Sequence, residues 1–309
     1  MYWLAIASIA SVVAAGRTND TSCPTKDISC PIVFDGRVPS FADGKSFANG
    51  SLPYNKDYVI GANLTWADAL AFPSSPKSNL FDNSTSKPVE VTFDDRSIFT
   101  PSPTNRQTGF RRAELQPQPI NANDSVTGIK TLHFSIKTDD SRPLNYTHEY
   151  SLVWLENAEY SANQFTIGTG KFFDSNSTSA EDAQSLYLVG NNGAGPQPAL
   201  WKTKFTPGVW HNFALVLDFA SNRIEVLYST RDKQLKRKTS FIANDMSGLG
   251  QYHVGILKKP TGPGGIDVTK QGFQSPGIHE GVVYGGVFIE DSSSGCVSVQ
   301  KGVKGRTTR

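Results

Sequence analysis

The sequence has almost no excess charge. Its 309 residues contain 30 Lys and Arg against 28 Asp and Glu, which gives a formal charge of +2 at pH 7. Nucleic-acid-binding domains carry basic stripes or patches, and none stands out here, so we expect no nucleic-acid partner. After residue 15, no segment contains the roughly 18 apolar residues that a membrane-spanning helix requires. We therefore expect no membrane partner either.

Several motifs of common enzyme classes are also missing. The sequence has no glycine-rich loop that would cradle a phosphate and no Gly-x-Ser-x-Gly nucleophile elbow. Its five histidines and three cysteines do not show the spacing of metal ligands. We therefore expect neither a metal ion nor an organic cofactor, and we expect the chain to act as a monomer.

The first 15 residues have the pattern of a secretory signal peptide. An apolar run ends in Val-Ala-Ala, and small residues occupy the positions that a signal peptidase reads, with cleavage near Ala15. A buried N-terminal element is the alternative. Residues 16–30 then form a polar N-terminal arm, residues 31–300 one folded domain, and residues 301–309 a basic, flexible tail. The sequence thus predicts a secreted, extracellular protein.

Two further features fit an oxidising compartment. A bridge between Cys30 and Cys296 would tie the two ends of the fold together, and a bridge between Cys23 and Cys30 is the alternative. Seven N-glycosylation sequons also indicate a glycosylated surface. They are centred on Asn19, Asn49, Asn63, Asn83, Asn123, Asn145 and Asn176.

Short β-branched and aromatic runs recur between Gly, Pro, Asn and Asp clusters, whereas helical periodicity is nearly absent. The best helical stretch is 66–72. Strand 209–219 is apolar on both faces, which suits a central strand, and strand 223–230 alternates and should be half exposed. About ten strands without helices between them predict an all-β sandwich of two antiparallel sheets. The strands are expected at 89–93, 110–116, 129–137, 149–156, 164–168, 185–189, 209–219, 223–230, 252–258 and 281–290.

The run from Phe110 to Gln116 carries the most informative polar residues. In a strand, Arg112, Glu114 and Gln116 share one face because side chains alternate with period two. An Arg, a carboxylate and an amide in a row resemble the floor of a polar substrate site, in which Arg112 would keep Glu114 ionised. A solvated outer strand with a cross-strand salt bridge is the alternative.

Two other strands contain candidate groups. Glu149 lies at the mouth of an apolar strand, beside Tyr150, whose ring could stack on a sugar or belong to the core. His253 would share a face with Gln251, where the imidazole could carry a proton or bind a sugar hydroxyl.

Six segments, in order, resemble those of glycoside hydrolase family 131, a group of fungal secreted β-glucanases. The resemblance covers about residues 31–296. It implies a jelly-roll β-sandwich with an open substrate groove and action on β-1,3-, β-1,6- and β-1,4-glucans. The region 172–197 is longer and more polar than expected of the family. The segments are Ile-Val-Phe-Asp-Gly-Arg-Val-Pro (32–39), Ser-Ile-Phe-Thr-Pro (97–101), Gln-Thr-Gly-Phe-Arg-Arg-Ala-Glu-Leu (107–115), Pro-Leu-Asn-Tyr-Thr-His-Glu-Tyr (143–150), Gly-Val-Trp-His-Asn-Phe (208–213) and Gly-Gln-Tyr-His (250–253).

The resemblance also implies that Glu114, Glu149 and His253 form the catalytic set. Glycoside hydrolysis needs one carboxyl group as an acid and a second as a base or nucleophile. We expect Glu114 to be the base because Arg112 favours its ionised form, which leaves Glu149 as the acid, and we favour inversion. Substrate binding would involve Arg112, Gln116, Tyr150 and Gln251.

Two other functions remain open from the sequence. Jelly-roll polysaccharide lyases have a strand that resembles Arg112-Ala113-Glu114-Leu115, and in such a lyase His253 or Tyr252 would be the base acting on a uronate polymer. A non-catalytic glucan-binding lectin on the same fold would need aromatic side chains but no acid pair.

Overall fold

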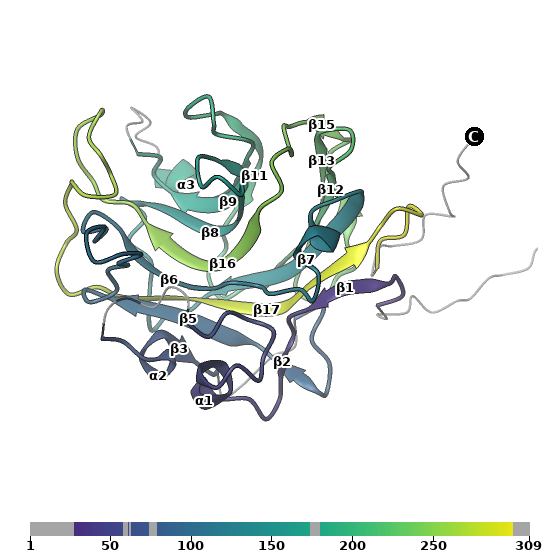
Figure 1. Ribbon diagram of the computed structural model, residues 1–309, viewed down its shortest axis with the longest axis horizontal. Coiled ribbons are helices and arrows are strands. Elements are labelled where there is room, and N and C mark those ends of the chain that lie inside the picture. The colour runs from purple at the N-terminus through teal and green to yellow at the C-terminus, as the bar shows by residue number, and fades with distance from the viewer. Residues whose placement is uncertain (1–27, 58–60, 62, 74–78, 174–179, 299–309) are drawn as a thin grey trace, which may run out of the picture.

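In the computed structural model, residues 28–57, 61, 63–73, 79–173 and 180–298 are described, the side chains of 180 and 181 excepted. The expected signal peptide, Asn19, Asn176, Cys23 and the basic tail lie outside the described residues. Two antiparallel sheets stack as a sandwich, which confirms the expected fold (Figure 1). All ten expected strands are present, within two or three residues of the expected bounds.

The larger sheet has nine strands. Its main path runs β14-β13-β12-β7-β17-β5-β3, β1 pairs with β17 and β15 pairs with β13. The long strand β17 lies at the middle of this sheet and binds β1, β5 and β7. The strands are β1 (Ile32–Asp35), β3 (Leu70–Ala71), β5 (Val89–Asp94), β7 (Ile129–Thr138), β12 (His211–Asp218), β13 (Arg223–Thr230), β14 (Lys236–Arg237), β15 (Ile242–Ala243) and β17 (His279–Asp291).

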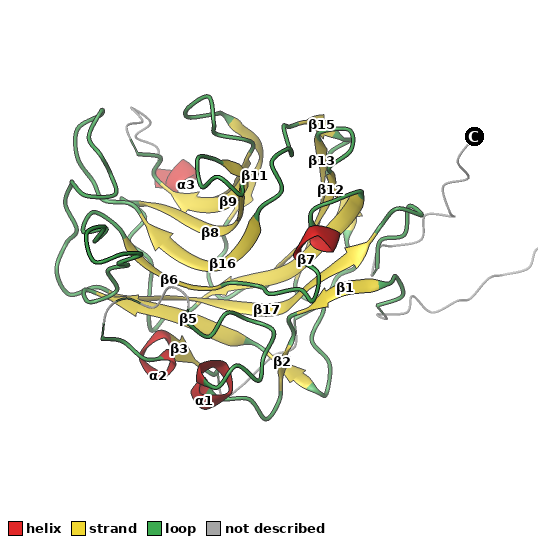
Figure 2. Ribbon diagram, in the orientation of Figure 1, coloured by secondary structure: helices red, strands yellow, loops and turns green. Residues whose placement is uncertain are grey.

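The smaller sheet has six strands in the order β11-β10-β9-β8-β16-β6. It lies above the nine-stranded sheet in Figure 1. Its strands are β6 (Arg111–Leu115), β8 (Glu149–Glu156), β9 (Asn163–Gly170), β10 (Ser185–Val189), β11 (Ala199–Lys204) and β16 (Gln251–Lys258). A two-stranded sheet and four short helical segments complete the described fold (Figure 2). They are β2 (Val38–Pro39), β4 (Ser86–Lys87), α1 (Gly44–Ala48), α2 (Trp66–Ala69), η1 (Ala122–Ser125) and α3 (Ala180–Ala183).

The core fills the space between the two sheets, and it determines which side chains face outward. In β6, Ala113 and Leu115 belong to the core, and in β16 so do Val254 and Ile256. Because neighbouring side chains in a strand point to opposite faces, the alternate residues of β6 and β16 lie on the outer face of the six-stranded sheet, away from the core. Figure 1 shows that loops rise at both ends of these strands.

Two local expectations need correction. The helix that begins at Trp66 ends at Ala69, because Leu70 and Ala71 pair with β5 instead. Strand β13 is not half exposed: Glu225 and Ser229 are 4% and 7% exposed. A second apolar cluster, which includes Leu235, covers the outer face of the nine-stranded sheet there. By contrast, β12 is central and fully buried, as expected.

A disulfide joins Cys30 to Cys296. This is the pairing expected to tie the ends of the fold together, and it links a residue two positions before β1 to a residue that follows β17. Of the helices that the structure describes, none is both long and apolar enough to cross a membrane.

Candidate active site

Strand β6 carries Arg112 and Glu114 on the outer face, as the period-two pattern predicts, and Gln116 follows its last residue. Glu114 lies directly opposite Gly255 of β16. A Cβ atom at Gly255 would lie 2.4 Å from the Cα of Glu114, so a larger residue could not occupy this position without moving β6. Glycine at 255 therefore lets the two strands approach each other beneath the glutamate.

The Glu114 carboxylate is fully buried and has partners on both oxygens. Arg112 Nε donates to Oε1 over 2.6 Å, and the Arg112 guanidinium also makes a shorter ion pair with the same oxygen. His253 Nδ1 lies 2.6 Å from Oε2. Burial by itself would raise the pKa of Glu114, but the charges of Arg112 and His253 outweigh it and hold this pKa below its usual 4.5. The carboxylate is thus kept ionised inside the protein.

His253 connects Glu114 to a second carboxylate. Its Nε2 lies 3.4 Å from Glu156 Oε2, at the end of β8. Burial would lower the pKa of His253, but the contact with Glu114 outweighs it and raises this pKa above 6.5. The indole of Trp154 stacks on the imidazole, with ring centroids 4.7 Å apart and planes 2° from parallel, and fixes its orientation. The side chain of Glu156 is 24% exposed, so the row of charged groups that begins at buried Glu114 ends at a carboxylate in contact with solvent.

Glu156 was not among the expected site residues, and Glu149 was expected in its place. Glu149 lies at the other end of β8, where its main-chain oxygen accepts from the main-chain N–H of Lys259. Lys259 directly follows β16 and lies four residues beyond Gly255 in the chain. At a rise of about 3.3 Å per residue, this offset puts Glu149 about 13 Å further along the sheet than Glu114. Its carboxylate binds Lys259 Nζ at 2.6 Å and the main-chain N–H of Phe173 at 2.7 Å. The structure does not bring Glu149 together with Glu114 and His253.

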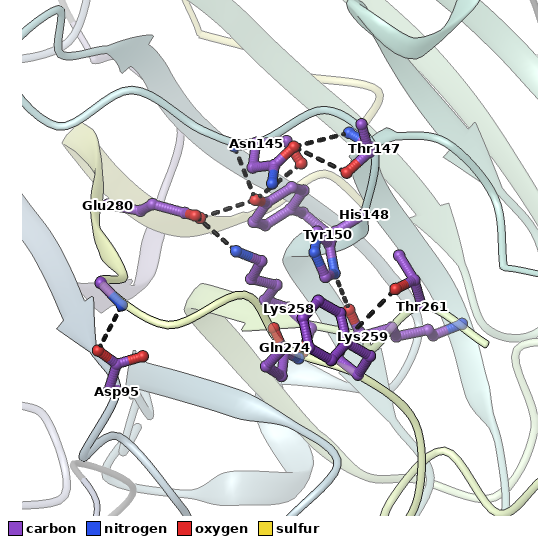
Figure 3. A network of polar contacts seen from close by, with 12 residues as sticks. Asp95, Asn145, Thr147, His148, Tyr150, Lys258, Lys259, Thr261, Gln274 and Glu280 are labelled. Carbon is purple, nitrogen blue, oxygen red and sulfur yellow. Dashed lines mark hydrogen bonds and ion pairs between the residues drawn. The ribbon is translucent and has the colours of Figure 1, made fainter.

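Tyr150 is also placed differently from the expectation of a sugar contact. Its side chain is fully buried and points between the sheets, where its hydroxyl donates to Glu280 Oε2 over 2.7 Å (Figure 3). Lys258 Nζ donates to the other oxygen of Glu280, and the main-chain N–H of Asn145 donates to the tyrosine hydroxyl. Burial raises the pKa of Tyr150 far above its usual range. The ring thus belongs to an internal polar network that joins the two sheets.

The two glutamines expected to bind substrate lie together on the outer face. Gln116 Nε2 donates to Gln251 Oε1, and Asn55 Nδ2 donates to Gln116 Oε1 over 3.0 Å. Gln251 lies directly opposite Glu156 in the pairing of β16 with β8. This amide row therefore adjoins the exposed carboxylate, and Asn55 is a member that sequence reasoning missed.

Tyr252 faces away from this cluster. Its ring lies in the core, and its hydroxyl donates to the main-chain oxygen of Ser125 over 2.8 Å. Within the described residues, no group of three or more His, Cys, Asp or Glu side chains is arranged to hold a metal ion.

Comparison with known proteins finds a family model that matches nearly all of the described chain. Residues 32–295 match the model of the glycoside hydrolase 131 catalytic N-terminal domain. A GH131 β-glucanase catalytic domain from Podospora anserina is 23% identical, with a TM-score of 0.63 over 87% of this chain and 98% of that one. The catalytic domain of a family 131 protein from Coprinopsis cinerea is 20% identical, with a TM-score of 0.64 over 88% and 98%. No curated protein matches the sequence.

Proposed function

The chain belongs to glycoside hydrolase family 131, and from that premise we propose that it is a secreted enzyme that hydrolyses β-glucans with β-1,3, β-1,6 and β-1,4 linkages. The β-glucanase activity of the similar Podospora anserina domain supports the substrate class. The disulfide supports secretion, because such bonds persist in oxidising compartments. In this proposal, residues 1–15 are the signal peptide and residues 31–300 the catalytic domain.

One observation carries the proposed mechanism: two carboxylates flank a single imidazole ring. The contacts of 2.6 Å from Glu114 and 3.4 Å from Glu156 lie on opposite ring nitrogens. Since the ring nitrogens are themselves about 2 Å apart, the two carboxylate oxygens are at most about 8 Å apart. This upper limit lies within the roughly 6.5 to 9.5 Å range of inverting glycosidases, and we propose inversion on that basis. We therefore assign Glu114 and Glu156, in place of Glu149, as the acid and base pair.

The environments of the two carboxylates differ, and the difference assigns their roles. Glu114 is held ionised by Arg112 and His253, so it is the base that activates water. Glu156 is partly exposed and meets the glycosidic oxygen as the acid. His253 contacts both carboxylates, and its charge helps to keep Glu114 ionised.

The lyase alternative is weakened by two contacts. A lyase of this kind needs an arginine free to neutralise a uronate, but Arg112 is paired with the fully buried Glu114. Its second candidate base, Tyr252, has its hydroxyl on the core side of the sheet. An enzyme that acts on neutral glucans needs neither an arginine free to bind a uronate nor a tyrosine base.

Hydrolysis of laminarin, lichenan and a β-1,6-glucan tests the proposal directly. Reducing ends should increase with time, and proton NMR of the first products should show the α-anomer, as inversion at a β-linkage requires. The β-anomer as first product would overturn the inverting pair. Binding without turnover would indicate a lectin, and unsaturated products from a uronate polymer would indicate a lyase.

A further inference from the structure

Two loops meet at the edge of the six-stranded sheet where β8 ends at Glu156 and β16 begins at Gln251. Residues 157–162 connect β8 to β9, and residues 244–250 lead into β16. The loops are joined directly, because the main-chain N–H of Ala158 donates to the oxygen of Gly248 over 3.2 Å.

The second loop is also pressed against the strand that carries Glu156. A Cβ atom at Gly250 would lie 2.0 Å from the main-chain oxygen of Glu156, so only glycine fits there. Buried Gln164 donates to the main-chain oxygens of Ser247, over 2.8 Å, and of Leu249. The pair of loops is therefore a fixed border of the candidate active site.

This border exposes two large apolar side chains in unusual backbone conformations. Tyr160 and Leu249 are 66% and 43% exposed. Their φ angles are 55° and 53°, in the left-handed region, which costs a residue with a side chain about 1 kcal/mol or more. Asn157 holds the turn: its main-chain oxygen accepts from Tyr160, and its side-chain oxygen accepts from Ser161. Because Tyr160 stays 66% exposed, burial of its side chain does not offset the cost of this backbone conformation.

We propose that Tyr160, together with Leu249 of the adjoining loop, is a binding subsite for a glucosyl unit of a β-glucan chain that extends beyond Glu156. The inference rests on the proposed function, since the ligand is the same chain that the carboxylates would cleave. The C–H face of a glucopyranose ring packs on an aromatic ring, and the phenol remains able to bond sugar hydroxyls. Isolated exposed apolar residues are common, but this one lies in a hydrogen-bonded turn that follows Glu156 directly in the chain, and the Glu156 carboxylate is partly exposed.

Tyr160→Asn is the sharpest test because asparagine accepts a left-handed backbone and should keep the turn folded. We expect KM for laminarin and lichenan to rise about fivefold to tenfold while kcat stays within about twofold, since the subsite binds the ground state and the transition state equally. Tyr160→Phe should keep KM within about twofold of the parent. The dissociation constant for laminarin, measured by titration calorimetry, should change in parallel with KM.

Phe41→Ala is the matched control. Phe41 is 83% exposed and precedes α1, which lies beyond the nine-stranded sheet, so its loss should leave KM unchanged. A Tyr160→Asn variant with the parental KM and affinity, or one that loses kcat alone, would overturn the subsite. A parent protein that neither binds nor cleaves the glucans would instead overturn the proposed function.

Discussion

Each sheet carries one buried His–Glu pair on its outer face, and the two pairs are alike in detail. In the nine-stranded sheet, His133 Nε2 lies 2.8 Å from Glu290 Oε1, and both side chains are fully buried. Phe288 stacks on this imidazole with centroids 4.4 Å apart, as Trp154 does on His253. Burial would raise the pKa of Glu290, but its contacts, chiefly with His133, lower it, as happens to Glu114.

The surroundings of the two pairs are what differ. Phe81 closes one side of His133, and Ser298 donates its main-chain N–H to Glu290 over 2.9 Å. The Ser298 hydroxyl in turn accepts from the main-chain N–H of Cys30, so the pair helps to fasten the two ends of the fold. The pair at Glu114 is instead joined to Arg112 and to the partly exposed Glu156. A buried His–Glu pair alone therefore does not identify an active site, and the continuation to a partly exposed carboxylate is what makes the pair at Glu114 the candidate.

The largest expected effect is on catalysis at the six-stranded sheet. Glu156→Gln and Glu114→Gln should each reduce kcat on laminarin by about 10² to 10⁴, because each removes a proton donor or acceptor from the transition state. Glu149→Gln is the matched control, since Glu149 is bound to Lys259 away from the pair, and its kcat should stay within about threefold. Loss of activity in Glu149→Gln with full activity in Glu156→Gln would reverse our assignment.

The next effect separates stability from catalysis at the other pair. Glu290→Gln should lower the free energy of unfolding by about 2 to 3 kcal/mol, because His133 and the main-chain N–H of Ser298 lose a buried, charged hydrogen-bond acceptor, and should leave kcat unchanged. At this chain length the loss corresponds to roughly 5 °C in Tm.

The pH dependence of that stability gives a second readout. Because the folded-state pKa of Glu290 lies below 4.5, its contribution is complete above about pH 4.5 and is lost as the pH falls through the folded-state pKa. The difference in Tm between the parent and Glu290→Gln should therefore shrink in acid. A difference that grows in acid would contradict the ionised state of Glu290.

The smallest effect concerns Arg112, the charged partner that distinguishes the pair at Glu114 from the pair at Glu290. Arg112→Gln removes an interaction that lowers the pKa of Glu114, so this pKa should rise and the acid limb of the kcat/KM profile should move to higher pH. The loss at neutral pH should be about tenfold or less, and the loss at pH 4 larger. An acid limb that does not move would mean that Glu114 is not the group that titrates in catalysis.

The sequence was sufficient for the strands and for one face of the site. Alternation along β6 and the residue after it placed Arg112, Glu114 and Gln116 on one side. Because Ala113 and Leu115 face the core, these three side chains must lie on the outer face. Helix and short edge strands were harder: residues 199–204 were not expected as β11, since their burial is irregular and their residues are partly exposed.

The partner of His253 could not be read from the sequence because it depends on register. His253 pairs with Trp154, which puts Glu156 next to the ring, but β8 also contains irregularities in its pairing with both neighbours. These change which residues share a face along β8. Glu149 and Glu156 are the two charged ends of one strand, and the family resemblance indicated Glu149, whereas the paired structure places Glu156 next to His253.

The bridge between Cys30 and Cys296 has a consequence for cleavage of the chain. It closes a covalent ring that contains both sheets, because the two cysteines have a sequence separation of 266. A protease that cuts once within any loop of this ring opens the ring but releases no fragment until the bridge is reduced. If the protein is secreted, as proposed above, a nick by an extracellular protease in a surface loop would leave all its strands in one covalent piece.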